Sequence, residues 1–295
     1  MNTLDATTQT LIRMALEEDI GNGDVTAQFF IPADARSHAR IIAKEPGILA
    51  GITVAATVFR QLDPLLHVQP LRKDGAPLLP GDPVMEISGP ARSLLSGERT
   101  ALNFLQRLSG IATLTHHYVQ AMGPTTCRLL DTRKTTPGWR TLEKAAVLAG
   151  GGTNHRHGLY DMVMVKDNHL LAEARLPELQ QAIDAVHQHH PGMRIELEAD
   201  RLSQVESFLT LRGVHVILLD NMTNQEMQRC VTLVAGRVQL EASGGVTLQR
   251  LASIAATGVD FISCGALTHS ARSLDLSLEF TGPTSSPERS TPSAI

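Results

Sequence analysis

RIELE (194–198) is the first of four short apolar runs, followed by HVILLD (215–220), VQLEAS (238–243) and FISCG (261–265). Their starts recur about every 21 to 23 residues. The stretches between them are amphipathic, at 204–211, 225–234 and 248–256. Strands and helices that alternate at this spacing predict right-handed βαβ crossovers and a parallel sheet.

Two more strands are expected upstream, at 127–132 and 162–165, with helices at 142–148 and 176–187. Six strands fall short of a complete (β/α) barrel, and a doubly wound open sheet also fits the alternation. Each strand ends in charged or small residues: Arg133 and Lys134, Lys166, Glu198, Asp220, Ser243 and Gly265. A barrel mouth collects residues from every strand, whereas an open sheet binds its ligand at one switch point. The fold class that we predict is α/β, with an incomplete (β/α) barrel.

The first 122 residues lack this alternation. A helix is expected at 5–19, and extended segments at 38–43, 65–71 and 83–88 surround a second helix at 52–62. A long helical region at 93–122, interrupted at Ser109-Gly110, is expected to link the halves. The last fifteen residues, TGPTSSPERSTPSAI, are rich in Pro, Ser and Thr, which predicts disorder. We therefore expect an α+β domain at 1–122, a barrel at 123–270 and a C-terminal segment at 271–295.

The composition excludes several classes of protein. Asp and Glu exceed Lys and Arg by 30 to 26, and proteins that bind nucleic acid usually carry a basic excess. No apolar run approaches the ~20 residues that span a bilayer. The N-terminal stretch lacks the pattern of a secretory signal, and three widely spaced cysteines suggest no disulfide framework. We expect a cytoplasmic protein with no nucleic-acid or membrane partner.

Four cations are expected at the barrel mouth. Arg133 and Lys134 follow the first strand, Arg156 follows the glycine run 150–152, and Lys166 closes the second strand. Each has an ordinary alternative, such as a structural ion pair or a lysine that reaches solvent. Together they would repel one another unless a ligand with several phosphates or carboxylates binds there.

Carboxylates are expected among these cations. Glu196 and Glu198 lie two apart on one strand and therefore on one face, and Asp220 ends the next strand. They can pair with the cations, hold Mg²⁺ or ribose hydroxyls, or stabilise a cationic transition state. We favour Glu198 because it lies nearer the end of its strand. His155 and His157 have no acidic or cysteine partner at ligand spacing, which argues against a metal site there.

Two glycine turns follow the last strands, at Ser243-Gly244-Gly245 and at Gly265-Ala266-Leu267. Tight turns between strand and helix need glycine in any case. However, free N–H groups in such turns bind phosphate, and the loops after the last two barrel strands are its usual site. The pair of turns predicts a phosphate site.

Long motifs in these segments resemble a known family. They are GERTALNFLQRLSGIAT (97–113), DTRKTTPG (131–138), GGGTNHR (150–156), VKDNH (165–169), LLDNM (218–222) and EASGGV (241–246). The chain resembles the type II phosphoribosyltransferases over nearly its whole length, specifically the quinolinate phosphoribosyltransferase (decarboxylating) family, also called nicotinate-nucleotide pyrophosphorylase (carboxylating).

The resemblance implies a fold and a reaction. The fold is an N-terminal α+β sandwich followed by an incomplete α/β barrel. The reaction joins quinolinate to 5-phosphoribosyl 1-diphosphate with Mg²⁺ and yields nicotinate mononucleotide, CO₂ and diphosphate in NAD biosynthesis. The rival hypotheses are a paralogous family linked to molybdenum transport, a non-catalytic phosphometabolite sensor and a nicotinate-using enzyme.

The resemblance also implies roles for individual residues. Arg133, Lys134, Arg156 and Lys166 are expected to bind the quinolinate carboxylates and the phosphate-bearing co-substrate, and His155 to line the quinolinate pocket. Glu198 and Asp220 are expected on the ribose and metal side, where Mg²⁺ is held mainly through the substrate, with these two carboxylates as its candidate protein contacts. The catalytic residues that the resemblance implies are Lys134, Lys166, Glu198 and Asp220. The 5-phosphate is expected at Ser243, Gly244, Gly245, Gly265, Ala266 and Leu267. Arg99 matches an arginine that reaches the neighbouring subunit's site, which implies a homodimer; assembly into a hexamer is left open.

Overall fold

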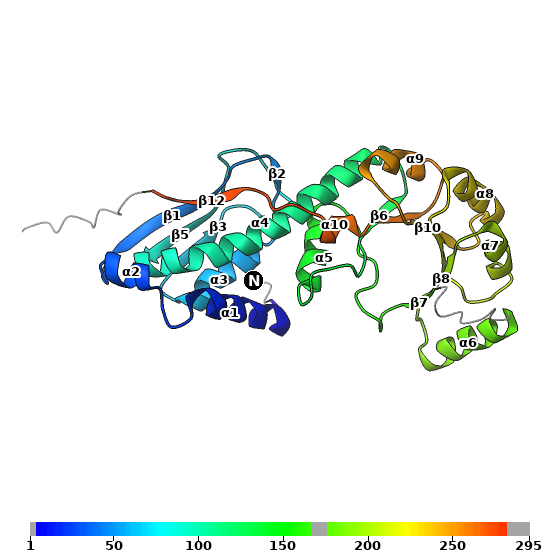
Figure 1. Ribbon diagram of the computed structural model, residues 1–295, viewed down its shortest axis with the longest axis horizontal. Helices are drawn as coiled ribbons and strands as arrows, with labels where there is room; N and C mark the ends of the chain where they lie inside the picture. The colour runs from blue at the N-terminus through cyan, green and yellow to red at the C-terminus, as the bar shows by residue number, and fades with distance from the viewer. Residues whose placement is uncertain (1–3, 167–175, 282–295) are drawn as a thin grey trace, which may run out of the picture. The chain divides into compact units, whose positions relative to one another are not determined.

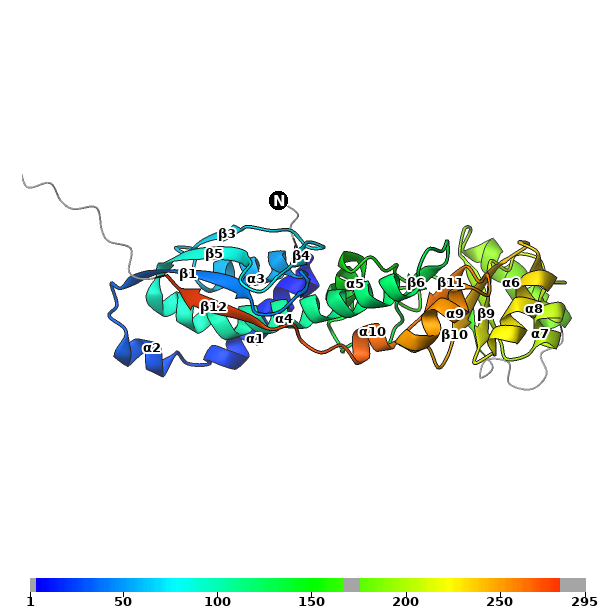
Figure 2. The same cartoon turned by 90° about the horizontal axis from the view of Figure 1, so that it is seen from above.

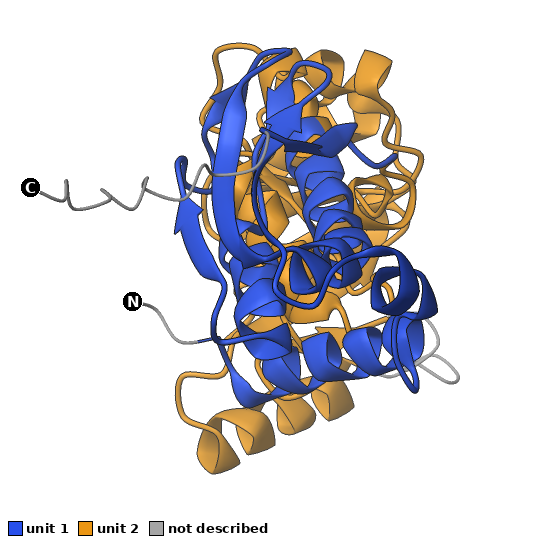
Figure 3. Ribbon diagram, turned by 90° about the vertical axis from the view of Figure 1, so that its left-hand side faces the viewer, with its two compact units in different colours: residues 1–113, 272–295 blue, residues 114–271 orange. Residues whose placement is uncertain are grey.

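The computed structural model describes residues 4–166 and 176–281. The chain divides into two compact units, residues 1–113 with 272–295 and residues 114–271 (Figure 3). The predicted disordered tail lies outside the described residues apart from Thr281, and so do Asp167, Asn168 and His169. The predicted domain boundaries at 122 and 270 stay a prediction.

The first unit is built on a four-stranded antiparallel sheet in the order β12-β1-β5-β3. Its strands are β1 (Arg36–Ala43), β3 (His67–Pro70), β5 (Pro83–Pro90) and β12 (Leu276–Phe280), and β2 (Gly47–Ile48) pairs with β4 (Pro77–Leu78). Its helices are α1 (Ala6–Ile20), α2 (Val25–Phe30), α3 (Ile52–Leu62) and the first part of α4 (Ala91–Ala121) (Figures 1 and 2). This arrangement confirms the predicted α+β class of the N-terminal part.

Local sequence accounts for these elements. Asp5 caps α1 by accepting the Thr8 N–H at 2.9 Å, and Asp24 caps α2 in the same way through Ala27. In β1, Ala39, Ile41 and Ala43 are buried at every second position, as a strand with one face on a core requires.

The expected interruption of the long helix at Ser109-Gly110 is wrong. Helix α4 runs unbroken over 31 residues. A Cβ added to Gly110 would lie 1.9 Å from the carbonyl oxygen of Arg272, so the glycine allows the returning chain to cross the helix closely. Ser109 Oγ donates to the Ala50 carbonyl and accepts the Ala50 N–H, which explains a polar residue that is fully buried.

The second unit contains the predicted six-stranded parallel sheet, in the order β6-β11-β10-β9-β8-β7. The strands are β6 (Arg128–Leu130), β7 (Val163–Val165), β8 (Ile195–Ala199), β9 (Val216–Asp220), β10 (Gln239–Ser243) and β11 (Phe261–Ser263). Helices follow them in sequence: α5 (Arg140–Ala149), α6 (Leu176–His189), α7 (Leu202–Phe208), α8 (Asn224–Val234), the 3₁₀ turn η2 (Leu248–Arg250), α9 (Leu251–Ala255) and α10 (Ala266–His269). Among the described residues, β6 and β7 are edge strands that do not pair with each other, so the barrel is incomplete, as predicted.

All six strands are parallel, so their carboxyl ends meet at one edge. In the β9–β10 ladder, Ser243 lies opposite Asp220. Leu218 and Leu219 in β9 are buried, whereas Asp220 at its end is half-buried. No helix in the described part of the chain is long and apolar enough to cross a membrane.

Candidate active site

Lys134 is held at the mouth by its backbone. Its N–H donates to Thr132 Oγ1 at 3.1 Å, and its carbonyl accepts the hydroxyl of the buried Thr268 at 2.7 Å. The side chain is exposed and passes close to Gly265, where a Cβ would lie 2.9 Å from Lys134 Cδ. The loop after β6 is therefore joined to the turn after β11, with the ammonium group left open to solvent.

Arg133 and Arg156 bring two positive charges close together in the site. The Nε of Arg133 is buried and has no hydrogen-bond partner among the described residues. Burial, and then the charge of Arg133, lower the pKa of Arg156 from its ordinary value. Arg156 donates to the Met162 carbonyl at 3.1 Å. Two guanidinium groups that repel each other, one with an unused buried donor, suit an anionic ligand.

Lys166, at the end of β7, forms an ion pair with Glu198 of β8. The lysine side chain is 42% exposed and the glutamate side chain 11%, so the pair lies at the open edge of the barrel. This placement brings together two residues that were predicted for the site from different strands.

Asp220 ends β9, and the glycine turn follows β10, the strand that pairs with β9. Asp220 Oδ2 accepts the side-chain N–H of Asn221 at 2.8 Å. Gly244 has φ +87°, and a Cβ there would lie 2.1 Å from Asn221 Oδ1. Only glycine fits this position, both because of its backbone conformation and because Asn221 approaches so closely. Ser243 and Gly245 flank it, and Gly265 directly precedes Ala266 and Leu267 at the start of α10.

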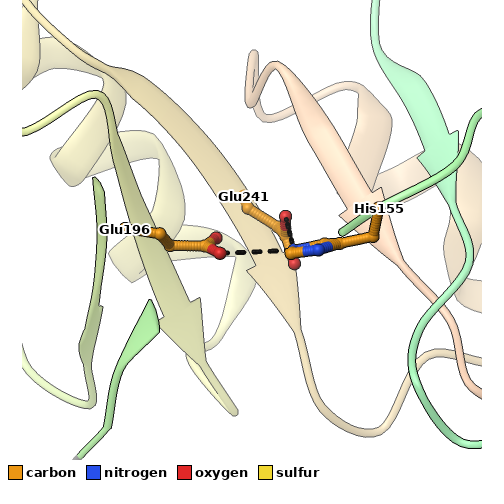
Figure 4. A group of neighbouring side chains, drawn as sticks. All are labelled: His155, Glu196 and Glu241. Atoms are coloured by element: carbon orange, nitrogen blue, oxygen red, sulfur yellow. Dashed lines mark ion pairs between the residues drawn. The ribbon is translucent and has the colours of Figure 1, made fainter. Parts of the chain in front are cut away.

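His155 points into the barrel interior, where it meets two buried carboxylates (Figure 4). Its Nε2 lies 3.2 Å from an oxygen of Glu196 on β8 and 3.2 Å from an oxygen of Glu241 on β10. These groups line a cavity of about 120 Å³ together with Arg128, Arg156 and Arg194. The geometry separates the two glutamates of β8: Glu196 is fully buried beside His155, and Glu198 lies at the mouth beside Lys166.

The cluster of His155, Glu196 and Glu241 holds extra protons. Burial alone lowers the pKa of His155, but hydrogen bonds to and charges on Glu196 and Glu241 raise it to about 9. Burial, together with the charge of Glu241, raises the pKa of Glu196. Because the Arg156 N–H donates to His155 Nδ1 at 2.7 Å, that nitrogen carries no proton and the single ring proton sits on Nε2. The extra proton of the cluster therefore lies on its carboxylates.

The same three residues form the one group of possible metal ligands found among the described residues. Both carboxylates face the single Nε2 of His155, and three of their four oxygens have no hydrogen-bond partner among the described residues. The three arginines that line the same cavity disfavour a further cation there. We therefore interpret the cluster as a group that shares a proton rather than as a metal site.

Sequence reasoning missed the polar residues beneath the mouth. Asp131 and Lys144 are almost completely buried and form an ion pair of 2.5 Å. Burial raises the pKa of Asp131, while Lys144 and the His155 N–H oppose that rise. Glu241 was not predicted as a site residue, although it belongs to the EASGGV motif. It lies two residues before Ser243, a spacing that places both on one face of β10 and was the available signal.

The predicted site residues are thus distributed over both units. The structure places those of the second unit at the carboxyl ends of β6 to β11, except for His155 and Arg156, which lie between α5 and β7 and line the inner cavity. Arg99 lies on α4 in the first unit, with a side chain that is 59% exposed. The ligands assigned to these residues stay predictions.

Comparisons with known proteins agree with this resemblance over most of the chain. Residues 24–109 match the family described as quinolinate phosphoribosyl transferase, N-terminal domain, and residues 111–279 match its C-terminal domain. The tobacco quinolinate phosphoribosyltransferase [decarboxylating] 1b is 42% identical over 285 residues, which cover 91% of this chain and 81% of that protein. The probable nicotinate-nucleotide pyrophosphorylase [carboxylating] of Bacillus subtilis is 42% identical, with 90% of each chain covered. The solved nicotinate-nucleotide pyrophosphorylase from Francisella tularensis superposes with a TM-score of 0.87 at 36% identity, covering 95% of this chain and 98% of that one.

Proposed function

The chain belongs to the quinolinate phosphoribosyltransferase family, and from that premise we propose how its residues carry the reaction. It is an enzyme that transfers the phosphoribosyl group of 5-phosphoribosyl 1-diphosphate to quinolinate in NAD biosynthesis. The products are nicotinate mononucleotide, CO₂ and diphosphate. The two substrates divide the described side chains into a quinolinate side and a phosphoribosyl side.

The quinolinate side is assigned to Arg133 and Arg156. The observation that carries this assignment is the unused buried Nε of Arg133 beside Arg156, whose pKa is lowered by burial and by the Arg133 charge. Both unfavourable features are relieved when a dicarboxylate binds between the two guanidinium groups, because bidentate carboxylate contacts are strong. Lys134 and Lys166 supply further positive charge, and His155 contributes through the backbone segment that it shares with Arg156.

The phosphoribosyl side is assigned to the later strands. Gly244 and Gly245 form a turn with positive φ angles, and Gly265 opens α10; their N–H groups are suited to the 5-phosphate. Asp220 and Glu198 supply oxygen atoms toward the ribose. They do not form an all-protein cage, which fits Mg²⁺, an ion usually held through one or two carboxylates and substrate phosphates. When bound, Mg²⁺ neutralises charge on the leaving diphosphate.

Charge stabilisation accounts for the chemistry without a covalent nucleophile. As the bond from ribose C1 to diphosphate breaks, positive charge grows on the ribose, and Glu198 and Asp220 stabilise it. The quinolinate nitrogen then forms the new bond to C1. Its pyridinium ring accepts the electron pair released when the adjacent carboxylate leaves as CO₂, and a proton is then taken up at that carbon. The cations hold both anions in place for these steps.

We also propose a homodimer in which Arg99 completes the neighbouring site. The support is that Arg99 is exposed and that its ion pair with the adjacent Glu98 is long, at 3.7 Å. Helix α2 in the same unit exposes Phe29 and Phe30 at 75% and 81%, and aromatic residues are enriched in the surfaces that partners cover. Assembly beyond the dimer and a cytoplasmic location stay predictions.

Diphosphate release by the purified protein tests the function directly. The assay contains Mg²⁺ and 5-phosphoribosyl 1-diphosphate with either quinolinate or nicotinate. Release with quinolinate alone, matched by CO₂, is the expected result. Release with nicotinate at an equal rate would contradict the assignment of two cation-bound carboxylates.

A further inference from the structure

Helix α5 presents three charged residues on one face. Arg140, Glu143 and Lys144 stand at positions i, i+3 and i+4, which lie side by side on a helix. Glu143 is completely buried and Lys144 is 2% exposed. Charged residues are rarely buried to this extent without a specific partner.

Lys144 holds the backbone of His155 together with Asp131. Asp131 Oδ1 accepts the His155 N–H at 2.8 Å, and Lys144 Nζ donates to the His155 carbonyl at 2.9 Å. With its amide nitrogen facing the acceptors, Asn154 donates to Asp131 Oδ2 at 2.8 Å and to the Lys144 carbonyl at 3.0 Å. The buried ion pair therefore grips the peptide groups on both sides of the His155 side chain.

Glu143 and Arg140 hold the other cation-bearing loop. Glu143 accepts the Thr136 N–H at 3.1 Å and its hydroxyl at 2.8 Å, two residues after Lys134. Arg140 donates to Thr135 Oγ1 at 3.0 Å and to the His157 carbonyl at 3.1 Å, so it contacts both loops. One face of α5 thus joins the loop of Arg133 and Lys134 to the segment of His155 and Arg156.

Stability alone does not account for the Asp131–Lys144 pair. A buried ion pair is often no better for stability than apolar residues of the same volume, because both charges lose their hydration. Segment 154–156 has no strand or helix pairing of its own, and it follows three glycines. Beyond the bridge between Thr153 and Leu130, the backbone of this segment is held by Asp131 and Lys144.

We propose that Lys144, acting with Asp131, is a positioning residue that places Arg156 and His155 for quinolinate binding. This inference rests on the proposed role of Arg156. A shift of the His155 peptide moves the Arg156 guanidinium, and a displacement of about 1 Å can cost a large factor in substrate binding or rate. The effect falls on quinolinate rather than on the phosphoribosyl donor, whose proposed turns lie on β10 and β11.

The test uses two variants and two controls in the full-length enzyme. Lys144→Met keeps a side chain of similar length but removes the positive charge and the hydrogen bond to the His155 carbonyl. The double variant Lys144→Met with Asp131→Asn also removes the uncompensated carboxylate, so it regains stability if charge alone matters. Lys44→Met is the matched control, because Lys44 forms an exposed ion pair with Glu279 in the other unit. Arg156→Ala reports on the proposed binding role itself.

KM for each substrate and the thermal unfolding midpoint are measured. The expected result is that the double variant recovers much of the midpoint lost in Lys144→Met, yet keeps a quinolinate KM raised about tenfold or more, with the donor KM changed less than about twofold. Recovery of both midpoint and quinolinate KM would overturn the inference and leave the pair a stability feature. An unchanged quinolinate KM in Arg156→Ala would overturn the assignment of Arg156 itself, and with it the inference.

Discussion

Lys166 at the end of β7 is paired with Glu198 at the mouth of the barrel, whereas Glu196, two residues earlier on the same face of β8, is fully buried beside His155. Strand alternation places both glutamates on one face, but it does not say how deep each lies. The depth depends on where β8 begins and ends. This difference in depth gives the two glutamates different partners: Glu196 faces His155, and Glu198 pairs with Lys166.

Glu198→Gln is therefore expected to lower kcat by about tenfold or more, because it removes a negative charge from the proposed ribose side of the site. The thermal unfolding midpoint should change little, since the pair lies at the open edge of the barrel with the lysine side chain 42% exposed, and exposed ion pairs contribute little to stability. Steady-state diphosphate release and thermal unfolding are the measurements. Glu279→Gln, at an exposed pair in the other unit, is the control. A wild-type kcat for Glu198→Gln would remove Glu198 from the mechanism.

The buried cluster predicts a dependence of stability on pH. The pKa of His155 is raised from 6.5 to about 9 in the folded protein, and because its Nδ1 accepts the Arg156 N–H, the proton that folding takes up is shared by His155, Glu196 and Glu241 as one cluster. The contribution of this proton to the free energy of unfolding is fully present below pH 6.5 and is lost as the pH rises through about 9. The raised pKa of Glu196 has the same sign.

Urea unfolding at a series of pH values checks this expectation. The midpoint of the wild-type protein should fall between pH 7 and 9.5. Glu241→Gln removes one of the two carboxylates that share the proton of the cluster, so its midpoint should fall less over the same range. Equal slopes for the two proteins would show that Glu241 does not set the titration of His155.

Gly244→Ala is expected to raise KM for 5-phosphoribosyl 1-diphosphate strongly and to destabilise the protein. The added Cβ would lie 2.1 Å from Asn221 Oδ1, so the turn must move. Gly236→Ala is the matched control, because Gly236 has a similar φ of +76° but nothing within 4 Å of the added Cβ. Gly236→Ala should lose about 1 kcal/mol of folding stability from the strain of a positive φ, and its KM should be unchanged. Equal KM values in both variants would argue against a phosphate at this turn.

The sequence was sufficient to predict the repeating strands and helices of the second unit and the polar residues at the strand ends. Lys166, Asp220 and Ser243 are readable because each follows an apolar run, and parallel strands bring their carboxyl ends together. The continuous helix through Gly110 could not be predicted, because this glycine is required by the close approach of the Arg272 backbone, 162 residues later in the chain. Strand β12 likewise joins the first sheet only because the chain returns there.

The buried polar residues were hidden for a different reason. Glu143 and Lys144 look like an ordinary solvated pair on an amphipathic helix, because charge in a helix usually marks its exposed face. Their burial depends on two irregular loops whose backbone groups need partners. Those partners are brought together only by the tertiary structure, so no local sequence pattern predicts the burial of Glu143 and Lys144.

Mixing two inactive variants tests whether Arg99 acts in the neighbouring site. Arg99→Ala and Lys134→Ala should each abolish most turnover in their own homodimers. If Arg99 serves the partner's site, a mixed dimer has one site with both lesions and one site that is intact. After subunit exchange at equal concentrations, roughly a quarter of wild-type activity should return, because half the dimers are mixed and half their sites are intact.

Arg40→Ala is the control for the mixing experiment, since Arg40 pairs with Glu86 on the first sheet and has no assigned role. Mixed with Lys134→Ala, it should give activity that rises only in proportion to the functional protomers it adds. If Arg99 instead acted within its own subunit, no site in an Arg99→Ala and Lys134→Ala mixed dimer would be intact. The mixture would then stay inactive, and the proposed exchange of Arg99 between subunits would be wrong.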